Sequence, residues 1–418
     1  MSNLAAQNSG LLGIAIILVL FIVGCSPKSE LNAVQGDVQV KIPVSSQSGN
    51  SSEYKLSIVT LKGLSSLKQV SGFFAQFFYA PGLNQNQLVG DSPQARFVKT
   101  KDNVYLPVDL ISQQMATLYF HMQNLAEFSK QIGTADTNSN PMKIGIETRV
   151  GDSEALSKNN AFYDGKSDAM LFVPFMSSEL PIAVNSGIIA LEYFHSLFYK
   201  LVLNKIKKPA VPVAKNRRPD LYNETFLRGV NEGLADFWGW AYTNDDDFIR
   251  WSLSSYSKSR KLVLNANSIG QYESAESIFS KVEIALNSGP EPSEYLSDYI
   301  YKIGTPNARF LKQLAVLLQQ GGLTSAEAKT KVAKSVILYL KSLSHKIATL
   351  VESEILPTES LFEFMASDDS QIKMNEGQCD FVLSYVQKSE LRTNDTCQKQ
   401  ADNSYKITPA VVIENGNE

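Results

Sequence analysis

The spacing of apolar residues changes along the chain and predicts strands first and helices later. Strand-like alternation and β-rich runs, interrupted by Gly, Asn and Pro turns, occupy residues 37–108. We interpret residues 37–44 as one edge strand and residues 54–108 as a small antiparallel unit. Helical spacing then begins at about residue 109, where an apolar face continues to residue 132.

Two more strands and several helices complete the pattern. Alternating or continuous apolar runs predict strands at residues 142–150 and 169–174. The chain after residue 270 is predicted to be helical, over residues 274–285, 307–319 and 325–350. This order of elements predicts an α+β fold, with a β-rich N-terminal part followed by a mainly α-helical C-terminal part.

Two helices carry acidic and imidazole groups where apolar residues are expected. Residues 187–199 have the composition of a buried helix, yet Glu192 and His195 lie one helical turn apart in it. In the second helix, Glu232 and Asp236 are spaced i and i+4 and so share one face. Because buried charged groups need partners, we expect the functional site where these helices meet.

These motifs resemble the gluzincin zinc metallopeptidases of the thermolysin and fungalysin type. In that family a His-Glu-x-x-His helix binds zinc through both histidines, and its Glu activates the metal-bound water. A Glu in an Asn-Glu-x-x-x-Asp helix is the third ligand. The resemblance implies that Glu192 is the general base, His195 the second ligand and Glu232 the third, whereas Leu191 stands at the place of the first histidine.

The resemblance also implies roles for residues around the ligands. Asp236 matches the carboxylate that orients the first ligand histidine, and Asn231 matches the Asn of the third-ligand motif. Asn160 and Ala161 lie in an Asn-Asn-Ala-Phe segment that resembles the family's edge strand, which holds a substrate by strand addition. The matching segments fall in family order within roughly residues 109–315.

The missing histidine lowers the expected affinity for zinc. A catalytic zinc normally has three protein ligands, and leucine has no lone pair to offer. Losing one imidazole costs on the order of 3 kcal/mol, roughly a hundredfold in affinity, so zinc binding is expected to be weak or absent. His121, Asp236 or a second water could replace the ligand. The family's oxyanion-stabilising histidine has no counterpart near residues 301–309, where Tyr301 or Arg309 could donate instead.

The N-terminal sequence predicts export and membrane attachment. An apolar run at residues 11–24 precedes Cys25 and Ser26 and resembles a bacterial lipoprotein signal, with cleavage before Cys25 and lipid on its thiol. Residues 1–10 contain no Lys or Arg, and an uncleaved anchor is the alternative. Either reading implies a protein tethered to the bacterial cell envelope, and Ser26 favours the outer membrane. The net charge of −3 gives no indication of a nucleic-acid-binding face.

The predicted organisation of the chain has five parts. Cys379 and Cys397 are an even pair in an exported chain, which indicates a disulfide, with two free thiols as the alternative. We divide the chain into a signal peptide (1–24), a tether (25–53), a β-rich part that ends in the His195 helix (54–200), a helical part with the Glu232 helix (201–350) and an irregular extension (351–418).

Three functions are compatible with these patterns. The first is a catalytically inactive, peptidase-like module that binds a peptide or an envelope protein in the former substrate cleft. The second is an active zinc metallopeptidase with a replacement ligand, and the third is a structural envelope lipoprotein. The loss of both a metal ligand and the oxyanion donor favours the first, with a membrane and a peptide or protein as partners and no nucleic acid.

Overall fold

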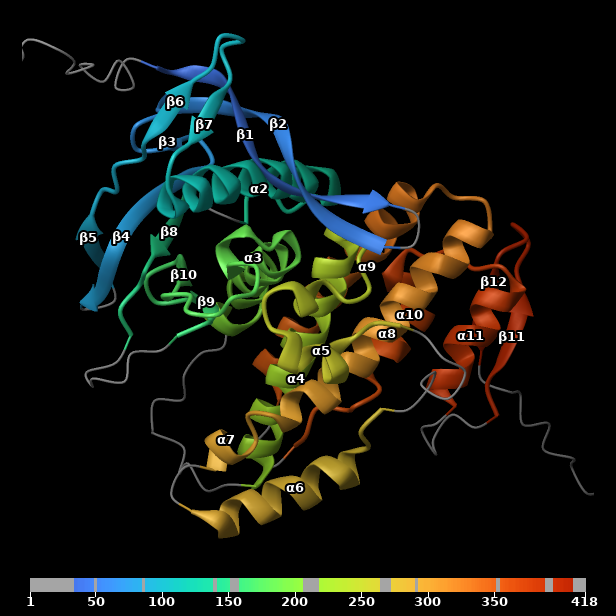
Figure 1. Cartoon of the computed structure of the whole chain (residues 1–418). Helices are drawn as coiled ribbons and strands as arrows, with labels where there is room; N and C mark the ends of the chain where they lie inside the picture. Colours follow the sequence, from blue (N-terminus) through green and yellow to red (C-terminus); the bar gives the residue numbers. More distant parts are fainter. Residues whose placement is uncertain are drawn as a thin grey trace, which may run out of the picture.

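A computed structural model gives the structure of most of the chain. The described residues are 34–48, 51–84, 87–137, 141–150, 158–205, 218–263, 272–289, 292–350, 354–387 and 394–408. The predicted signal peptide and Cys25 therefore lie outside the described residues. Within them the fold is α+β, with a β-rich N-terminal region followed by a helical C-terminal region (Figure 1).

The first sheet covers one side of a long helix. Its strand order is β3-β2-β1-β7-β6. Alternate residues of β1, among them Val40 and Ile42, are buried on the face that packs against α2 (Figure 1). These elements are β1 (Gly36–Ser48), β2 (Ser51–Ser66), β3 (Ser71–Gly72), β6 (Phe97–Lys99), β7 (Tyr105–Pro107) and α2 (Leu110–Ile132).

The predicted edge strand at residues 37–44 is instead a central strand. β1 pairs antiparallel with β2 and parallel with β7. The parallel partner lies more than fifty residues away, so local alternation could indicate the strand and not its neighbours. Residues 36–48 and 51–53 consequently belong to the sheet, so the predicted tether, 25–53, is wrong for these residues.

The second sheet forms one wall of the candidate site. Its strand order is β5-β4-β8-β10-β9, which places β9 at an edge. β4, β8 and β10 are parallel, and β9 is antiparallel to β10. The predicted antiparallel unit at 54–108 is therefore wrong, because its strands divide between two mixed sheets. The strands are β4 (Ala75–Asn84), β5 (Gln87–Asp91), β8 (Met142–Ile146), β9 (Ala161–Asp164) and β10 (Ala169–Phe172).

Two central helices, α3 (Ser186–Leu201) and α4 (Arg218–Thr243), carry the motif residues. Asn185 caps α3, because its side chain accepts hydrogen bonds from the backbone N–H groups of Gly187 and Ile188. α3 packs against α4, and α4 in turn packs against α8 (Tyr299–Gln320). This packing places the Glu192–His195 turn of α3 opposite the Glu232 turn of α4.

Helix α8 begins earlier than the predicted 307–319 helix. Its first turns contain Gly304 and Pro306, which favour a break in sequence-based interpretation. Close packing explains the Gly, because a Cβ placed on Gly304 would lie 2.5 Å from the backbone oxygen of Gly229 on α4. The earlier start brings Tyr301, one turn before Gly304, to the candidate site.

The C-terminal segment is folded against the helical region. Cys379 on α11 and Cys397 on β11 form a disulfide. Phe310 of α8 contacts the rings of Phe381 and Tyr385. The prediction of an irregular extension is therefore wrong over most of this segment. Its elements are α10 (Ser360–Ala366), η5 (Asp368–Ser370), α11 (Glu376–Val386), β11 (Thr396–Lys399) and β12 (Tyr405–Thr408).

Shorter elements and one long helix complete the structure. α9 (Ser325–Thr349) begins with a capping box made by Thr324 and Glu327. No helix within the described ranges is long and apolar enough to cross a bilayer. The remaining elements are η2 (Ile182–Val184), η3 (Leu203–Lys205), η4 (Phe248–Trp251), α5 (Ser254–Arg260), α6 (Ala275–Ser288) and α7 (Pro292–Tyr295).

Candidate functional site

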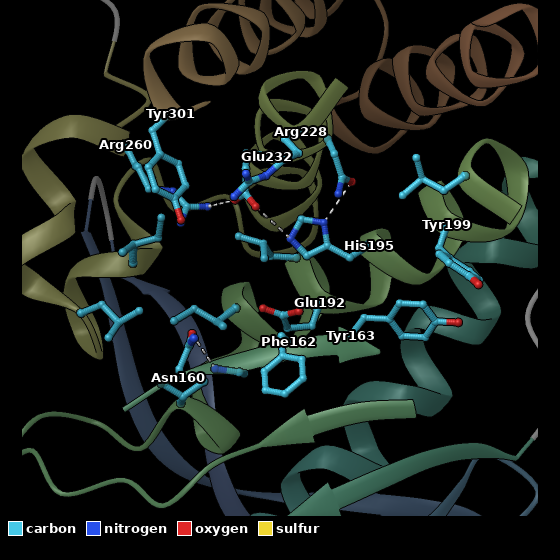
Figure 2. A pocket seen from close by; sticks show the side chains of 18 residues that line it. Asn160, Phe162, Tyr163, Glu192, His195, Tyr199, Arg228, Glu232, Arg260 and Tyr301 are labelled. Atoms are coloured by element: carbon cyan, nitrogen blue, oxygen red, sulfur yellow. Dashed lines mark hydrogen bonds and ion pairs between the residues drawn. The ribbon is translucent and has the colours of Figure 1, made fainter. Parts of the chain in front are cut away.

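A cavity of about 520 Å³ brings together most of the motif residues. Edge strand β9 lies on one side of it, α3 and α4 form the centre, and Arg260 and Tyr301 lie on the other side (Figure 2). The lining includes eight residues singled out in the sequence, namely Asn160, Ala161, Leu191, Glu192, His195, Asn231, Glu232 and Tyr301.

His195 is held by two residues of α4. Its Nδ1 lies 3.0 Å from Asn231 Oδ1, and because an amide oxygen only accepts, Nδ1 donates the proton. Its Nε2 lies 3.7 Å from Glu232 Oε1 (Figure 2). Asn231 therefore fixes the imidazole so that Nε2 faces the carboxylate.

Arg260, at the end of α5, supplies a buried cation to the site. Its Nη2 donates to Asp236 Oδ1 at 2.6 Å and to Glu232 Oε2 at 3.3 Å, and its Nε donates to Asp236 Oδ2 at 3.2 Å. The guanidinium also lies 4.4 Å from the ring centroid of Tyr301. One buried cation thus joins both acidic residues of the Glu-x-x-x-Asp motif.

The charges of this cluster compensate each other. Burial raises the pKa of Asp236, and the neighbouring guanidinium opposes that rise. Burial alone would lower the pKa of Arg260, but Asp236 and Glu232 raise it above its ordinary value. Arg260 is therefore protonated at any physiological pH and holds Asp236 in place.

The residues at the expected metal position do not fit a zinc ion. Leu191 is buried in the cavity wall at the first-ligand position, and Glu232 is already paired with Arg260. In the part of the chain that the structure describes, no three His, Cys, Asp or Glu side chains are grouped to hold a metal. A dication beside Glu232 would meet the positive guanidinium, whose nearest nitrogen is 3.3 Å from that carboxylate.

The replacement groups named from the sequence are engaged elsewhere. His121 lies outside the cavity lining, and its Nδ1 is 2.8 Å from the hydroxyl of Tyr242. Asp236 accepts both hydrogen bonds from Arg260, so it is a buried support behind the cavity. Arg309 donates to the carbonyl of Lys261, whereas Tyr301 lines the cavity.

Glu192 is buried without full hydrogen bonding. Its side chain points into the space between β9 and the His195–Glu232 pair (Figure 2). Within the described structure its Oε2 has no hydrogen-bond partner, and the residue is 5% exposed. Burial raises the pKa of Glu192 to about 7, despite the opposing effects of His195, Arg260 and the backbone N–H of Tyr163.

The edge of β9 faces the same cavity. Ala161, Phe162 and Tyr163 line it, and the opposite edge of the strand is paired with β10. Asn160 precedes the strand, and its Oδ1 accepts a hydrogen bond from the backbone N–H of Ala161 at 2.9 Å (Figure 2). The two residues predicted to bind a peptide therefore line the cavity at the outer edge of β9, where the Asn160 side chain accepts the N–H of Ala161.

Arg260 is the site residue that sequence reasoning missed. It lies in the sequence Ser-Arg-Lys, 24 residues after Asp236, with no motif around it. The available signal was indirect, because two acidic residues on a buried face without a metal ion require a cation from elsewhere.

Comparison with known proteins adds no family assignment. No protein-family model matches the sequence, and a search of curated proteins finds no significant match. The resemblance to gluzincins rests on the motif residues of the sequence and stays a prediction.

Proposed function

We propose that this protein is an envelope lipoprotein whose peptidase-like cleft binds an extended peptide or a segment of an envelope protein and does not hydrolyse it with zinc. The observation that carries the proposal is the ion pairing of Arg260 with Glu232 and Asp236. A side-chain cation neutralises the carboxylates that would otherwise attract a metal, and Leu191 offers no ligand.

The free edge of β9 supports peptide binding. An added strand would pair with the outer edge of β9 at Ala161 and Tyr163, where it would replace the present acceptors of these two backbone N–H groups, Asn160 Oδ1 and the Glu192 carboxylate. Side chains of that strand would then reach the cavity, where they meet the Glu192 carboxylate and an apolar wall that includes Leu191 and Ile188. An edge strand that lies beside a cavity able to take side chains supports strand addition as the mode of binding.

Metal content and proteolysis test the hypothesis that the cleft does not hydrolyse peptides with zinc. We expect the purified natural protein to contain no stoichiometric zinc and to leave casein intact. Leu191→His adds the missing imidazole but keeps Arg260, so we expect weak zinc binding. The double variant Leu191→His with Arg260→Ala is expected to bind zinc about a hundredfold more tightly than the natural protein. Stoichiometric zinc in the natural protein, with casein cleavage that Glu192→Gln abolishes, would identify an active peptidase instead.

Substitutions at the edge of β9 test the hypothesis that a peptide binds there as an added strand. Ala161→Pro removes the outward N–H and places a ring on the free edge, where proline is compatible with an edge strand. We expect it to abolish binding of a mixed heptapeptide library, measured by fluorescence polarisation. Ala161→Ser retains the N–H and is the matched control, which should bind as the natural protein does. Equal binding by both variants would exclude β9 as the binding edge, and no binding by the natural protein would leave the structural-lipoprotein alternative.

A further inference from the structure

Glu192 is the acidic group that the rest of the site leaves uncompensated. The cations on the described lining are already committed, since Arg260 pairs with Asp236 and Glu232. Arg228 lies 4.0 Å from Glu224 and donates to the carbonyl of Ser293. Glu192 Oε2 meanwhile is buried and has no partner among the described residues.

The surroundings of Glu192 limit what could satisfy it. His195 cannot donate to it at Nδ1, because that proton is given to Asn231. The backbone N–H of Tyr163 lowers the pKa of Glu192 through a hydrogen bond, which leaves the second carboxylate oxygen. In its ionised form this oxygen only accepts, so a hydrogen-bond donor that enters the cavity from outside would satisfy it.

The cavity walls favour a donor at the end of an apolar stem. Ile188, Leu191 and Leu253 provide aliphatic surface, and Phe162 and Tyr163 lie beside the carboxylate (Figure 2). Lys and Arg side chains combine an aliphatic stem with a cationic head, and cations are also attracted to aromatic faces. A buried carboxylate gains most from a donor that carries a positive charge.

We propose that this cavity is a subsite for a positively charged group of the bound peptide, an ammonium or a guanidinium, which Glu192 receives through its free Oε2. The inference rests on the proposed function and names the chemistry of its ligand. A Lys or Arg side chain reaches Glu192 along the aliphatic wall while the peptide backbone pairs with β9. A peptide amino terminus is the other source of the same ammonium chemistry.

Sets of heptapeptides with one fixed central residue test this subsite. The central residue is Lys, Arg, norleucine or Glu, the other positions are mixtures of uncharged residues, and both ends are blocked by acetylation and amidation. A separate set has norleucine at the centre and a free amino terminus. Binding to the full chain is measured by competition in fluorescence polarisation, with the natural protein, Glu192→Gln and Glu276→Gln. Glu276 is exposed on α6 and serves as the matched control.

We expect the natural protein and Glu276→Gln to bind the Lys and Arg sets about tenfold to a hundredfold more tightly than the blocked norleucine set. Glu192→Gln should lose this preference, so that it binds the Lys, Arg and norleucine sets with similar affinity. Tight binding of the free-amino-terminus set alone would assign the ammonium to the chain end. Equal affinity for the Lys, norleucine and Glu sets, or a Lys preference that survives Glu192→Gln, would overturn the subsite. Since backbone pairing is judged by Ala161→Pro on the same sets, such a result leaves the proposed peptide binding intact.

Discussion

Asp236 shows how the site compensates a buried negative charge. A buried carboxylate must meet a cation or take up a proton, because burial disfavours its charged form. Here the guanidinium of Arg260 donates two hydrogen bonds to it and a third to Glu232. The pair is thus a structural ion pair with a defined geometry, and its disruption has a measurable cost.

Removing the cation should destabilise the protein strongly. Arg260→Met keeps much of the side-chain volume but leaves Asp236 buried and unpaired, for which we expect a loss of about 3–5 kcal/mol in the free energy of unfolding. Arg260→Lys should lose less free energy of unfolding, because lysine keeps the positive charge. It should still lose some, because lysine cannot make the two-point hydrogen bonding of the guanidinium to Asp236. Urea unfolding measures both changes.

The double variant Arg260→Met with Asp236→Asn is the control for this pair. It removes the Asp236 charge that Arg260→Met leaves buried and unpaired, so we expect it to recover part of the free energy of unfolding. If Arg260→Met alone unfolds at the same urea concentration as the natural protein, the ion pair contributes nothing to the fold.

Glu192 should make stability depend on pH in a defined direction. Its folded-state pKa is raised from 4.5 to about 7, so the folded protein binds more protons than the unfolded chain between these values. The stabilisation is fully present below pH 4.5 and is lost as pH rises through 7. The expected slope is up to about 1.4 kcal/mol per pH unit in this window.

Glu192→Gln removes this titration. We expect the variant to gain stability relative to the natural protein as pH rises from 5 to 8, as measured by urea unfolding at each pH. Glu276→Gln, on an exposed position of α6, should follow the natural protein throughout. A constant difference between Glu192→Gln and the natural protein across that range would show that Glu192 has an ordinary pKa.

The residues of the site differ in how far the sequence could predict them. His195, Glu232, Asn231 and Asn160 could be placed together, because helical spacing and a family resemblance both apply to short segments. Arg260 could not, since its position depends on how α5 folds back over α4, and no local pattern encodes that contact.

At the scale of elements, the sequence predicted helices better than strand partners. Helix α2 follows its apolar spacing and ends at Gly133, whose positive φ of 80° suits glycine. Alternation indicated β1 equally well, yet its parallel partner β7 is a long-range choice that no local signal records. The early start of α8 was missed for a related reason, because Gly304 looks like a helix breaker until its contact with α4 is known.

The close crossing of α4 and α8 positions two site residues. A Cβ on Gly233 would lie 2.1 Å from the backbone oxygen of Gly304, so the helices can approach this closely only with glycine there. Glu232 precedes Gly233, and Tyr301 lies one turn before Gly304. The glycine contact thereby brings the part of α8 that carries Tyr301 close to the Glu232 turn of α4.

Gly233→Ala should therefore cost stability and disturb the site together. We expect a loss of about 1–3 kcal/mol in the free energy of unfolding, because the clash is with backbone that cannot rotate away. Gly377→Ala is the matched control, since its added Cβ would have no neighbour closer than 3.9 Å. That change should be neutral or stabilising, as alanine is the better helix former. A Gly233→Ala protein as stable as the Gly377→Ala protein would show that α4 and α8 can separate freely.

For the whole molecule, the C-terminal segment is part of the helical core. Its sparse apolar residues suggested an irregular extension, yet Phe362, Met365, Cys379 and Tyr385 are buried. Few but large side chains packed around Phe310 of α8 are enough to bury the segment. The density of apolar residues in a sequence underestimates such packing, because it does not show which residues of other segments they contact.

Two truncations distinguish a core segment from an accessory one. Ending the chain at residue 387 removes β11, β12 and the disulfide, whose 18-residue separation corresponds to about 3 kcal/mol of stability. Ending it at residue 350 also removes α10 and α11 and exposes Phe310, which is fully buried in the intact protein. We expect the first protein to fold with reduced stability. We expect the second to be insoluble or to bind a hydrophobic dye, because the free energy gained by burying several aromatic rings exceeds the free energy of unfolding of a typical domain. Circular dichroism and size-exclusion chromatography measure both outcomes.

If the protein that ends at residue 350 stays monomeric and unfolds cooperatively, the helical region is complete without the C-terminal segment. The aromatic contacts of Phe310 would then only attach that segment to it.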